Sequence, residues 1–295
     1  MLTDILQLLI YGVILGSVIA LGAIGVSLIF GILRFAHFAH GDLMTAGAYF
    51  ALFFMTATGA SIWLAFPFAV LAAIAVALAF DRIVYRRLRR TRPVILLIAS
   101  IGVAFILRNA VLAVWGPDIT VYESGIKPPI RFAGLRIKED QLAIIIGAVV
   151  LVVLLSLFLQ RTRMGKAMRA MADDPDLARI TGIDTDRVIL WTWVIGAGLA
   201  AAGGVFLALD TRLQPTLGWD ILLAIFAATI LGGIGKPYGA IVGAMVVGIS
   251  AELGAGLPGV FGADWSLTAY KPAITFALMI AMLLWRPQGL IGGRT

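Results

Sequence analysis

The chain has 295 residues, of which 61% are hydrophobic and only 13% are charged. A soluble domain carries about twice that share of charge because water must wet its surface, so the composition excludes an ordinary soluble protein. The absence of cysteine excludes a disulfide framework and a thiolate metal site. The net charge of +7 fits the basic cytoplasmic loops of a membrane protein better than nucleic-acid binding.

Nine apolar segments follow one another along the chain. A bilayer core about 30 Å thick needs roughly 20 apolar residues in helical form, and its lack of water permits only helices or a closed barrel. Strict period-two alternation is absent, which favours helices. The segments cover residues 5–33, 43–58, 61–81, 94–115, 140–160, 188–210, 220–234, 237–257 and 272–285. We predict an all-α, polytopic integral membrane protein with about eight or nine transmembrane helices, in one domain over residues 1–295.

Some of these segments are unusual spans. Residues 43–58 and 220–234 are short for a full crossing, and glycines interrupt several other segments. We therefore expect at least one broken or re-entrant helix. The first segment has neither a basic residue before its apolar run nor a cleavage signature, which is typical of a retained span rather than a signal peptide.

Basic residues gather in the turns that nine spans would place on one side. Residues 82–92 contain six arginines, and further basic residues lie in 161–187 and in the tail. Of the 23 Lys and Arg residues, sixteen fall on this side, six fall on the other, and Arg108 lies within a span. Cytoplasmic loops carry an excess of Lys and Arg, so we expect an external N-terminus and a cytoplasmic C-terminus.

The longest segment expected outside is 116–139. Its pieces ITVYESG and IRFAGLRI lie on either side of Pro128 and Pro129. Short runs rich in β-branched and aromatic residues, separated by turn residues, are typical of hairpins. We therefore predict a small external β-hairpin in this loop.

The inner loop 161–187 has the pattern of two short helices. Met164, Met168 and Met171 recur at helical spacing, which places three flexible apolar side chains on one face. The charged residues of another face are Lys166, Arg169 and Asp173. Such a helix fits a groove on a partner protein. The alternatives are a helix on the membrane surface or a compact loop.

A break divides this inner loop. The run Asp173-Asp174-Pro175 is typical of a helix end followed by a new N-terminus, which acidic residues and a first-turn proline favour. Gly182 is expected to end the second short helix.

Polar residues interrupt the apolar pattern at Arg34, His37, His40 and Asp42. The two histidines lie three positions apart and share a face if the stretch is helical. They could line the transport pathway or a gate beside a helix break. The alternative is a cytoplasmic turn held by a pair of Asp42 with Arg34 or with His40. Two histidines alone make a poor metal site, so we predict none.

Glycine is frequent at 31–47 and 231–243. Gly239 and Gly243 form a small-xxx-small face that lets helices approach closely. We expect packing or hinge roles for the glycines of both stretches, namely Gly31, Gly41, Gly47, Gly232, Gly233, Gly235, Gly239 and Gly243.

The chain carries little catalytic chemistry. No G-x-x-x-x-G-K-[ST] phosphate loop, Ser/His/Asp arrangement or H-E-x-x-H motif occurs, so we predict no enzyme activity, no catalytic residue and no cofactor in this chain. Arg108 and Glu252 stand alone within apolar segments. An unpaired charge there costs about 2.5 kcal/mol or more, so each should face protein or water rather than lipid.

Four runs resemble one known family in the same order. These are FGILRFAHFAHGDLMTAGAY, TRMGKAMRAMADDPDLARITGID, ILGGIGKPYGAIVGA and RPQGLIG, which extend from about residue 20 to 293. They resemble the permease family of branched-chain amino acid ABC transporters, and the length suits its shorter, H-type subunit. In that family the second run contacts the ATPase subunit.

The resemblance implies a set of partners. Two permease subunits, usually non-identical, pair on two cytoplasmic ATPases that hold ATP and Mg²⁺, and an extracytoplasmic binding protein delivers the ligand. The chain would then lie in the bacterial cytoplasmic (inner) membrane. ATPase coupling would fall to residues Met164, Gly165, Lys166, Met168, Arg169, Met171, Asp173, Asp174, Pro175 and Gly182.

Two alternatives remain open at this point. A member of the same family could import urea, short amides or other amino acids, because the binding protein selects the ligand. A different class would be an ATPase-independent secondary transporter or channel, which would need an intramembrane ion site with several carboxylates.

Overall fold

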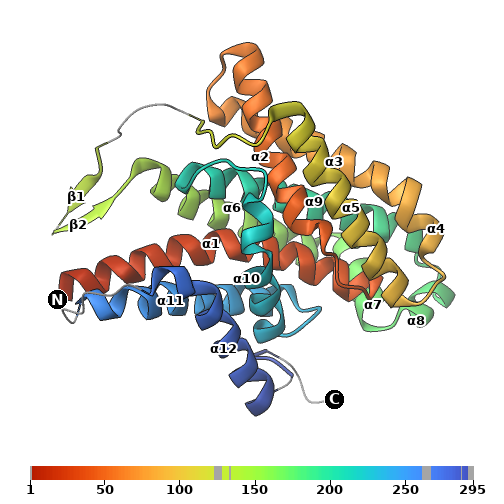
Figure 1. Ribbon diagram of the computed structural model, residues 1–295. Helices are drawn as coiled ribbons and strands as arrows, with labels where there is room; N and C mark the ends of the chain where they lie inside the picture. Colours follow the sequence, from red (N-terminus) through yellow and green to blue (C-terminus); the bar gives the residue numbers. More distant parts are fainter. Residues whose placement is uncertain (1, 123–127, 133, 261–266, 287, 292–295) are drawn as a thin grey trace.

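The computed structural model describes residues 2–122, 128–132, 134–260, 267–286 and 288–291 (Figure 1). Helices make up most of these residues. In chain order the elements are α1 (Leu2–Leu33), α2 (Ala39–Thr58), α3 (Ile62–Phe80), a π-helical turn (Asp81–Tyr85), α4 (Arg86–Leu88), α5 (Pro93–Trp115), β1 (Ile130–Phe132), β2 (Leu135–Ile137), α6 (Glu139–Arg161), α7 (Arg163–Asp173), α8 (Pro175–Ile180), α9 (Thr185–Asp210), α10 (Leu217–Gly232), α11 (Pro237–Val260), a 3-10 turn (Thr268–Tyr270) and α12 (Lys271–Trp285).

The helices account for the nine predicted apolar segments. Six helical stretches among the described residues are long and apolar enough to cross a membrane, namely Leu2–Leu33, Ile62–Leu88, Pro93–Trp115, Glu139–Arg161, Thr185–Asp210 and Pro237–Val260. The remaining three segments correspond to α2, α10 and α12. The prediction of an all-α, polytopic membrane protein is confirmed.

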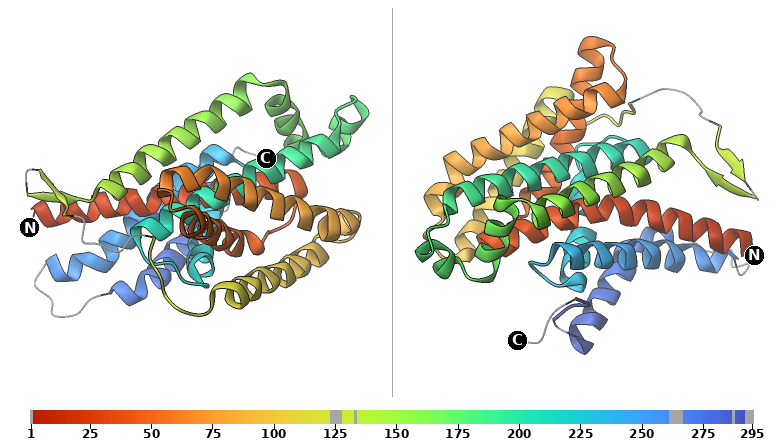
Figure 2. Two further views of the ribbon diagram at one scale, coloured as in Figure 1. Left: turned by 90° about the horizontal axis from the view of Figure 1, so that it is seen from above. Right: turned by 180° about the vertical axis from the view of Figure 1, so that it is seen from behind.

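Helix α1 runs through the centre of the molecule, between α6 and α9 on one side and α11 on the other (Figure 2). In the most apolar 18-residue stretch of α1, 83% of the residues are buried, against 17% in the corresponding stretch of α6. α1 is therefore a core helix, and α6 presents most of its side chains outward. Small residues permit the close packing of α1 on α11. A methyl group at Gly248 would lie 2.5 Å from the backbone nitrogen of Gly16.

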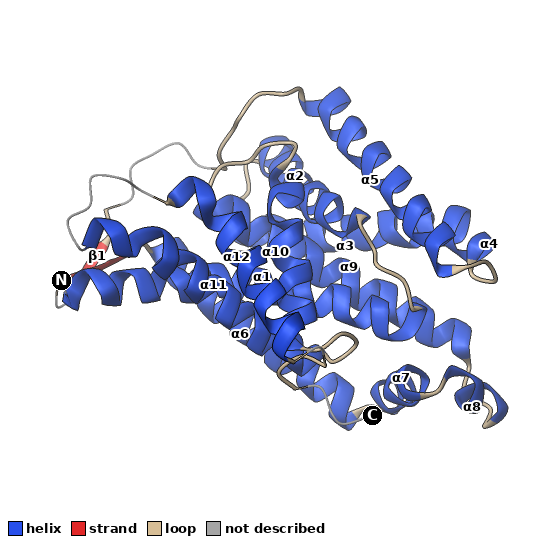
Figure 3. Cartoon of the chain, turned by 60° about the horizontal axis from the view of Figure 1, so that its bottom comes forward, coloured by secondary structure: helices blue, strands red, loops and turns tan. Residues whose placement is uncertain are grey.

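The hairpin and the α7–α8 pair, which the charge pattern assigned to opposite sides of the membrane, lie at two different ends of the bundle (Figure 3). At the hairpin end, which carries the start of α1 and the two strands, Gln7 makes two hydrogen bonds of 2.8 Å with the backbone of Arg136. At the α7–α8 end, Arg34 donates a hydrogen bond of 2.6 Å to the carbonyl oxygen of Ala172. Turns predicted to share a side therefore lie together.

The hairpin forms differently from the prediction. Both strands come from IRFAGLRI, with Ile130 opposite Ile137, and Gly134 in the turn adopts a φ of +83°. In the described part of the ITVYESG piece, Thr120 pairs with Leu213 before α10 and not with these strands; residues 123–127 lie outside the described part of the chain. A short loop costs less entropy to close than a long one, so the local turn prevails.

Helix breaks occur where glycine and polar residues interrupt the pattern. α1 ends at Leu33, and Arg34 has a φ of +58° before α2 begins. α10 has only 16 residues, so it is about 24 Å long and shorter than the hydrocarbon core. Gly233 and Gly235 reverse the chain after α10, with φ of 110° and 79°.

Candidate functional site

The first candidate region is the pair of short helices α7 and α8. The Thr162 side chain caps α7 by accepting a hydrogen bond of 2.9 Å from the Gly165 amide. Asp174 ends α7 and caps α8, and its Oδ1 accepts hydrogen bonds of 3.0 Å from the amides of Asp176 and Leu177. Pro175 opens α8, as the sequence predicted, and the turn after α8 contains Gly182 at a φ of +86°.

The methionine face of α7 points into this chain. Met168 and Met171 are 1% and 5% exposed and belong to the core formed with the membrane helices. Gly165 allows this fold-back, because a methyl group there would lie 2.4 Å from the carbonyl oxygens of Phe158 and Leu159. The prediction that the methionine face enters a groove on a partner is wrong for Met168 and Met171, whereas Met164 is only partly buried. They pack instead on the nearest apolar surface, which is the chain's own bundle.

The opposite face of these helices is exposed and mixed in character. Leu177 and Ile180 are 53% and 80% exposed, although they are large apolar residues. We name the α7–α8 surface by its exposed residues Lys166, Arg169, Asp173, Asp174, Leu177 and Ile180. Sequence analysis missed Leu177 and Ile180 as a possible contact, because α8 is short and both residues have charged neighbours in the sequence.

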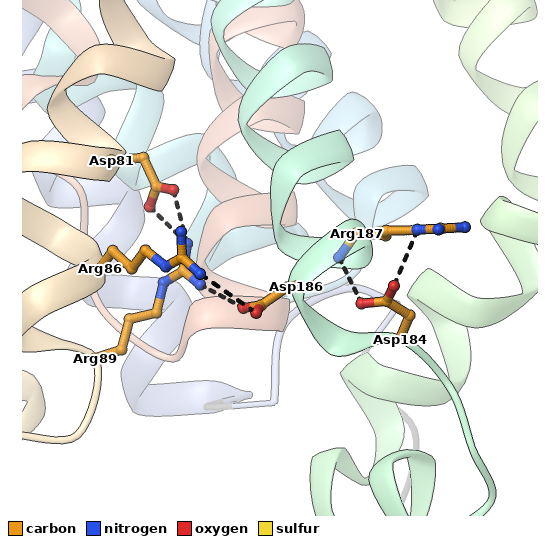
Figure 4. A network of polar contacts seen from close by, with 6 residues as sticks. All are labelled: Asp81, Arg86, Arg89, Asp184, Asp186 and Arg187. Carbon is orange, nitrogen blue, oxygen red and sulfur yellow. Dashed lines mark hydrogen bonds and ion pairs between the residues drawn. The ribbon is translucent and has the colours of Figure 1, made fainter.

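A network of charges fixes the start of α9 beside this surface (Figure 4). Arg89 binds both oxygens of Asp81 at 2.8 and 2.7 Å and reaches Asp186 at 3.0 Å. Arg86 lies 3.8 Å from the same Asp186 carboxylate, and Arg187 forms a separate pair with Asp184. The network joins the end of α3 to the start of α9. The sequence analysis used the arginines of residues 82–92 for orientation and did not predict these pairs.

The polar residues 37–42 are buried rather than open to a pathway. His37 and His40 are 3% and 0% exposed, and their ring centroids lie 6.0 Å apart. Nε2 of His37 lies 3.0 Å from the Tyr85 hydroxyl in a hydrogen bond, and the His37 ring packs edge-on against Trp193 at 5.1 Å. Among the described residues no group of three potential metal ligands occurs. These histidines are part of the packed interior.

Asp42 forms an ion pair with Arg108, the arginine within the α5 span. Its two oxygens accept hydrogen bonds of 2.9 and 3.0 Å from Nε and Nη2 of Arg108. The guanidinium also lies 4.5 Å from the ring centroid of Trp219. The predicted pairs of Asp42 with Arg34 or His40 are wrong, because Arg34 turns toward α7 and Arg108 arrives from α5. The prediction that Arg108 faces protein is confirmed.

Glu252 is likewise paired. Its Oε1 lies 2.5 Å from Nζ of Lys271 at the start of α12. The expectation that this intramembrane carboxylate faces protein or water is confirmed, since Glu252 also borders a cavity.

A cavity of about 910 Å³ lies at the hairpin end, between α1, α9, α10, α11 and α12. The charged residues of its lining are Lys138, Asp210, Arg212, Asp220 and Lys271. The Trp219 side chain also lines it. His37, His40 and Asp42 do not line it. Sequence reasoning missed this site. The signal in the sequence is that these charges stand at, or just beyond, the ends of apolar segments.

The glycines named from the sequence lie at close helix contacts. A methyl group at Gly41 would lie 2.4 Å from the Gly218 carbonyl oxygen, and one at Gly47 would lie 2.6 Å from Cα of Ala201. The contacts of the second stretch are Gly31 with Gly235, Gly232 with Gly239, and Gly243 with Ala228. α1, α2, α9, α10 and α11 therefore approach one another with little side-chain volume between them.

Comparison with known proteins gives consistent results. A family model described as "Branched-chain amino acid transport system / permease component" matches residues 8–283. The high-affinity branched-chain amino acid transport system permease protein LivH of Escherichia coli K12 is 34% identical over 97% of this chain and 95% of its own. The LivM permease protein of the same strain is 28% identical over 58% of this chain and 40% of its own.

One solved structure supports the fold alone. PsaBC from Streptococcus pneumoniae, in complex with Fab, matches with a TM-score of 0.54 and 12% sequence identity. The match covers 96% of this chain and 91% of that chain, so the similarity in fold extends over nearly the whole of both chains.

Proposed function

The chain belongs to the branched-chain amino acid transport system permease family, and from that premise we propose that it forms one of the two permease subunits of an ATP-driven importer of branched-chain amino acids. The observation that carries the proposal is the family match over residues 8–283, together with 34% identity to LivH across 97% of the chain. The membrane is the bacterial cytoplasmic membrane, which six long apolar helices suit.

The energy for transport comes from partner subunits. The sequence contains no phosphate loop, so we assign ATP and Mg²⁺ to two cytoplasmic ATPases. Their contact on this chain is the α7–α8 surface, where Leu177 and Ile180 offer exposed apolar groups beside Lys166 and Arg169. Met168 and Met171 hold that surface against the membrane helices and transmit its movement.

The orientation follows from charge. The α7–α8 end carries the arginine-rich turn 82–92 and the loop 161–187, so it faces the cytoplasm. We assign the C-terminus to the same side, which is supported by Ile291 lining a pocket with Met168 and Arg169 and by the 2.8 Å hydrogen bond from the Leu290 amide to the Leu231 carbonyl oxygen. The hairpin end faces outward, toward an extracytoplasmic binding protein.

A second permease completes the pathway. Similarity to both LivH and LivM supports pairing with a related, non-identical subunit. The whole of residues 1–295 acts as a single permease domain, in which the close glycine contacts of α2 and α10 allow rigid helices to shift against each other.

Reconstitution tests the proposal. The importer, assembled from this chain, its sister permease, both ATPases and the binding protein, should accumulate leucine in proteoliposomes only with ATP inside the ATPase-facing compartment. Uptake should persist when ion gradients are dissipated. Leucine uptake by this chain alone, driven by an ion gradient, would contradict the proposal.

A further inference from the structure

The cavity at the hairpin end carries an unusual set of charges. It is formed by segments far apart in the sequence: the middle of α1, the end of α9, the start of α10 and the start of α12. A second cavity of about 520 Å³ shares Lys138, Asp210, Thr211 and Lys271 with it. Both volumes suit a small ligand.

Among the described residues, the side chains that hydrogen-bond to two carboxylates of the lining are neutral. Oδ1 of Asp210 accepts a hydrogen bond of 2.9 Å from Gln141. Oδ2 of Asp220 accepts hydrogen bonds of 2.8 Å from Gln214 and 3.2 Å from Thr216. Neither carboxylate forms an ion pair with a described residue. Each can therefore receive a cation that enters the cavity.

The opposite charge is also present. Arg212 follows Asp210 by two residues, lines the same cavity and has no ion-pair partner within the described part of the chain. Lys271, by contrast, is already neutralised by Glu252. A free guanidinium presents paired N–H donors that match the two oxygens of a carboxylate.

The remaining wall is apolar and partly branched. Leu15 and Ile19 from α1 and Leu217 and Ile221 from α10 line the cavity. Trp219 closes it on the side of α5, where the Arg108 guanidinium stacks on its ring and is itself fixed by Asp42. The wall offers an aliphatic side chain a surface of matching character.

We propose that this cavity is a low-affinity site for the transported amino acid in its zwitterionic form. Asp210 and Asp220 receive the α-ammonium group, Arg212 receives the α-carboxylate, and the branched side chain lies against Leu217 and its apolar neighbours. This inference rests on the proposed function, because it gives the outward-facing permease its own means of recognising an amino acid after release from the binding protein.

Cysteine protection tests the site directly. The chain contains no cysteine, so Thr211→Cys introduces a single thiol at an exposed position of the lining. Ser61→Cys is the matched control, an exposed hydroxyl residue between α2 and α3 that lines neither cavity. In the assembled importer, modification of this chain by a charged methanethiosulfonate reagent is followed by mass spectrometry.

The expected result is selective protection. Millimolar leucine, isoleucine or valine should slow modification at Thr211→Cys several-fold and leave Ser61→Cys unaffected. The analogues 3-methylbutylamine and 4-methylpentanoate each lack one charged group and should not protect. Equal protection by these analogues, no protection by leucine, or a thiol that does not react because a partner subunit covers it would each overturn the proposal.

Charge removal provides the second measurement. Adding Asp220→Asn or Arg212→Gln to Thr211→Cys should raise the leucine concentration for half-protection about tenfold, since a hydrogen bond to a charged group is lost. Asp118→Asn, an exposed aspartate outside both cavities, should not change it. A half-protection concentration unmoved by both cavity variants would also overturn the proposal.

Uptake separates this proposal from the proposed function. ATP-driven leucine uptake without leucine protection would exclude the site and leave the importer role intact. Leucine protection without ATP-driven uptake would exclude the role and leave the site.

Discussion

The two ends of the molecule differ in the charged groups that stand out: ion pairs between helices at one end, and charges beside a cavity at the other. At the α7–α8 end, Arg89 binds the largely buried Asp81 and the exposed Asp186, and Met168 packs α7 against the bundle. At the hairpin end, Asp220 and Arg212 remain without an ion-pair partner among the described residues and line a cavity. The first end is tied together by ion pairs between helices, and the second leaves charged groups beside a cavity.

A third kind of charge lies between these ends and fixes the helices. Asp42 is completely buried, and its carboxylate meets Arg108, whose side chain is 15% exposed. The pair joins α2 to α5 and, through Trp219, to α10. Four sets of substitutions test how these charged and packed groups differ.

The largest expected effect concerns this interior pair. Asp42→Ala leaves the Arg108 guanidinium without a counter-charge, and breaking a buried pair costs about 3–5 kcal/mol. We expect a large fall in the thermal unfolding midpoint of the detergent-purified protein. The double variant Asp42→Asn with Arg108→Gln removes both charges and should recover most of the loss. Equal destabilisation by the single and double variants would show that charge pairing is not the cause.

The packing of α7 should be nearly as sensitive. Met168→Ala removes a side chain that is 1% exposed, and such truncations cost about 2–5 kcal/mol. Thermal unfolding should shift downward, and the ATPases should dissociate more readily because the α7–α8 surface is no longer held in place. Met164→Ala, on the same helix but only partly buried, should cost less. A reversed order would contradict the burial seen here.

The α7–α8 surface should matter for association rather than for folding. Ile180→Asp replaces an apolar side chain that is 80% exposed with a charged one, so the thermal unfolding midpoint should change little. Co-purification of the ATPases should fall at least about tenfold if Ile180 occupies a pocket on the partner. Arg169→Glu combined with Asp173→Lys should weaken association in the same assay. ATPase retention in both variants would place the contact elsewhere.

The smallest effect is expected from the outer part of the charge network. Arg86 is 57% exposed and lies 3.8 Å from Asp186, and exposed pairs contribute at most about 1 kcal/mol. Arg86→Ala should therefore leave the unfolding midpoint nearly unchanged. Arg89→Ala should lower it more, because Arg89 is 18% exposed and binds two carboxylates. Equal shifts would mean that burial does not distinguish the two arginines.

The architecture could be read from local patterns. Each of the nine apolar segments corresponds to a helix, and turns assigned to one side by charge lie at one end. The break at Asp174 and Pro175 was predicted because capping and proline chemistry act within one helical turn. These features depend on interactions between residues close together in the chain, or on the preference of a segment for lipid over water. Neither requires contact with another helix.

The candidate sites were decided by contacts between distant segments. Asp42 and Arg108 are 66 positions apart, and no local rule distinguishes Arg108 from His40 or Arg34 as the partner of that carboxylate. The methionine spacing predicted one face of α7 correctly, but hydropathy does not say whether such a face meets a partner or the chain's own bundle.

The sequence by itself determined that the chain is a bundle of membrane helices with a basic side, because length and hydropathy are sums over neighbouring residues. Only the tertiary structure decided which charges are neutralised and which remain free in the cavity. That outcome depends on how each helix is rotated and how closely glycine contacts such as Gly41 with Gly218 let the helices approach. Such distances arise only when all the helices pack together.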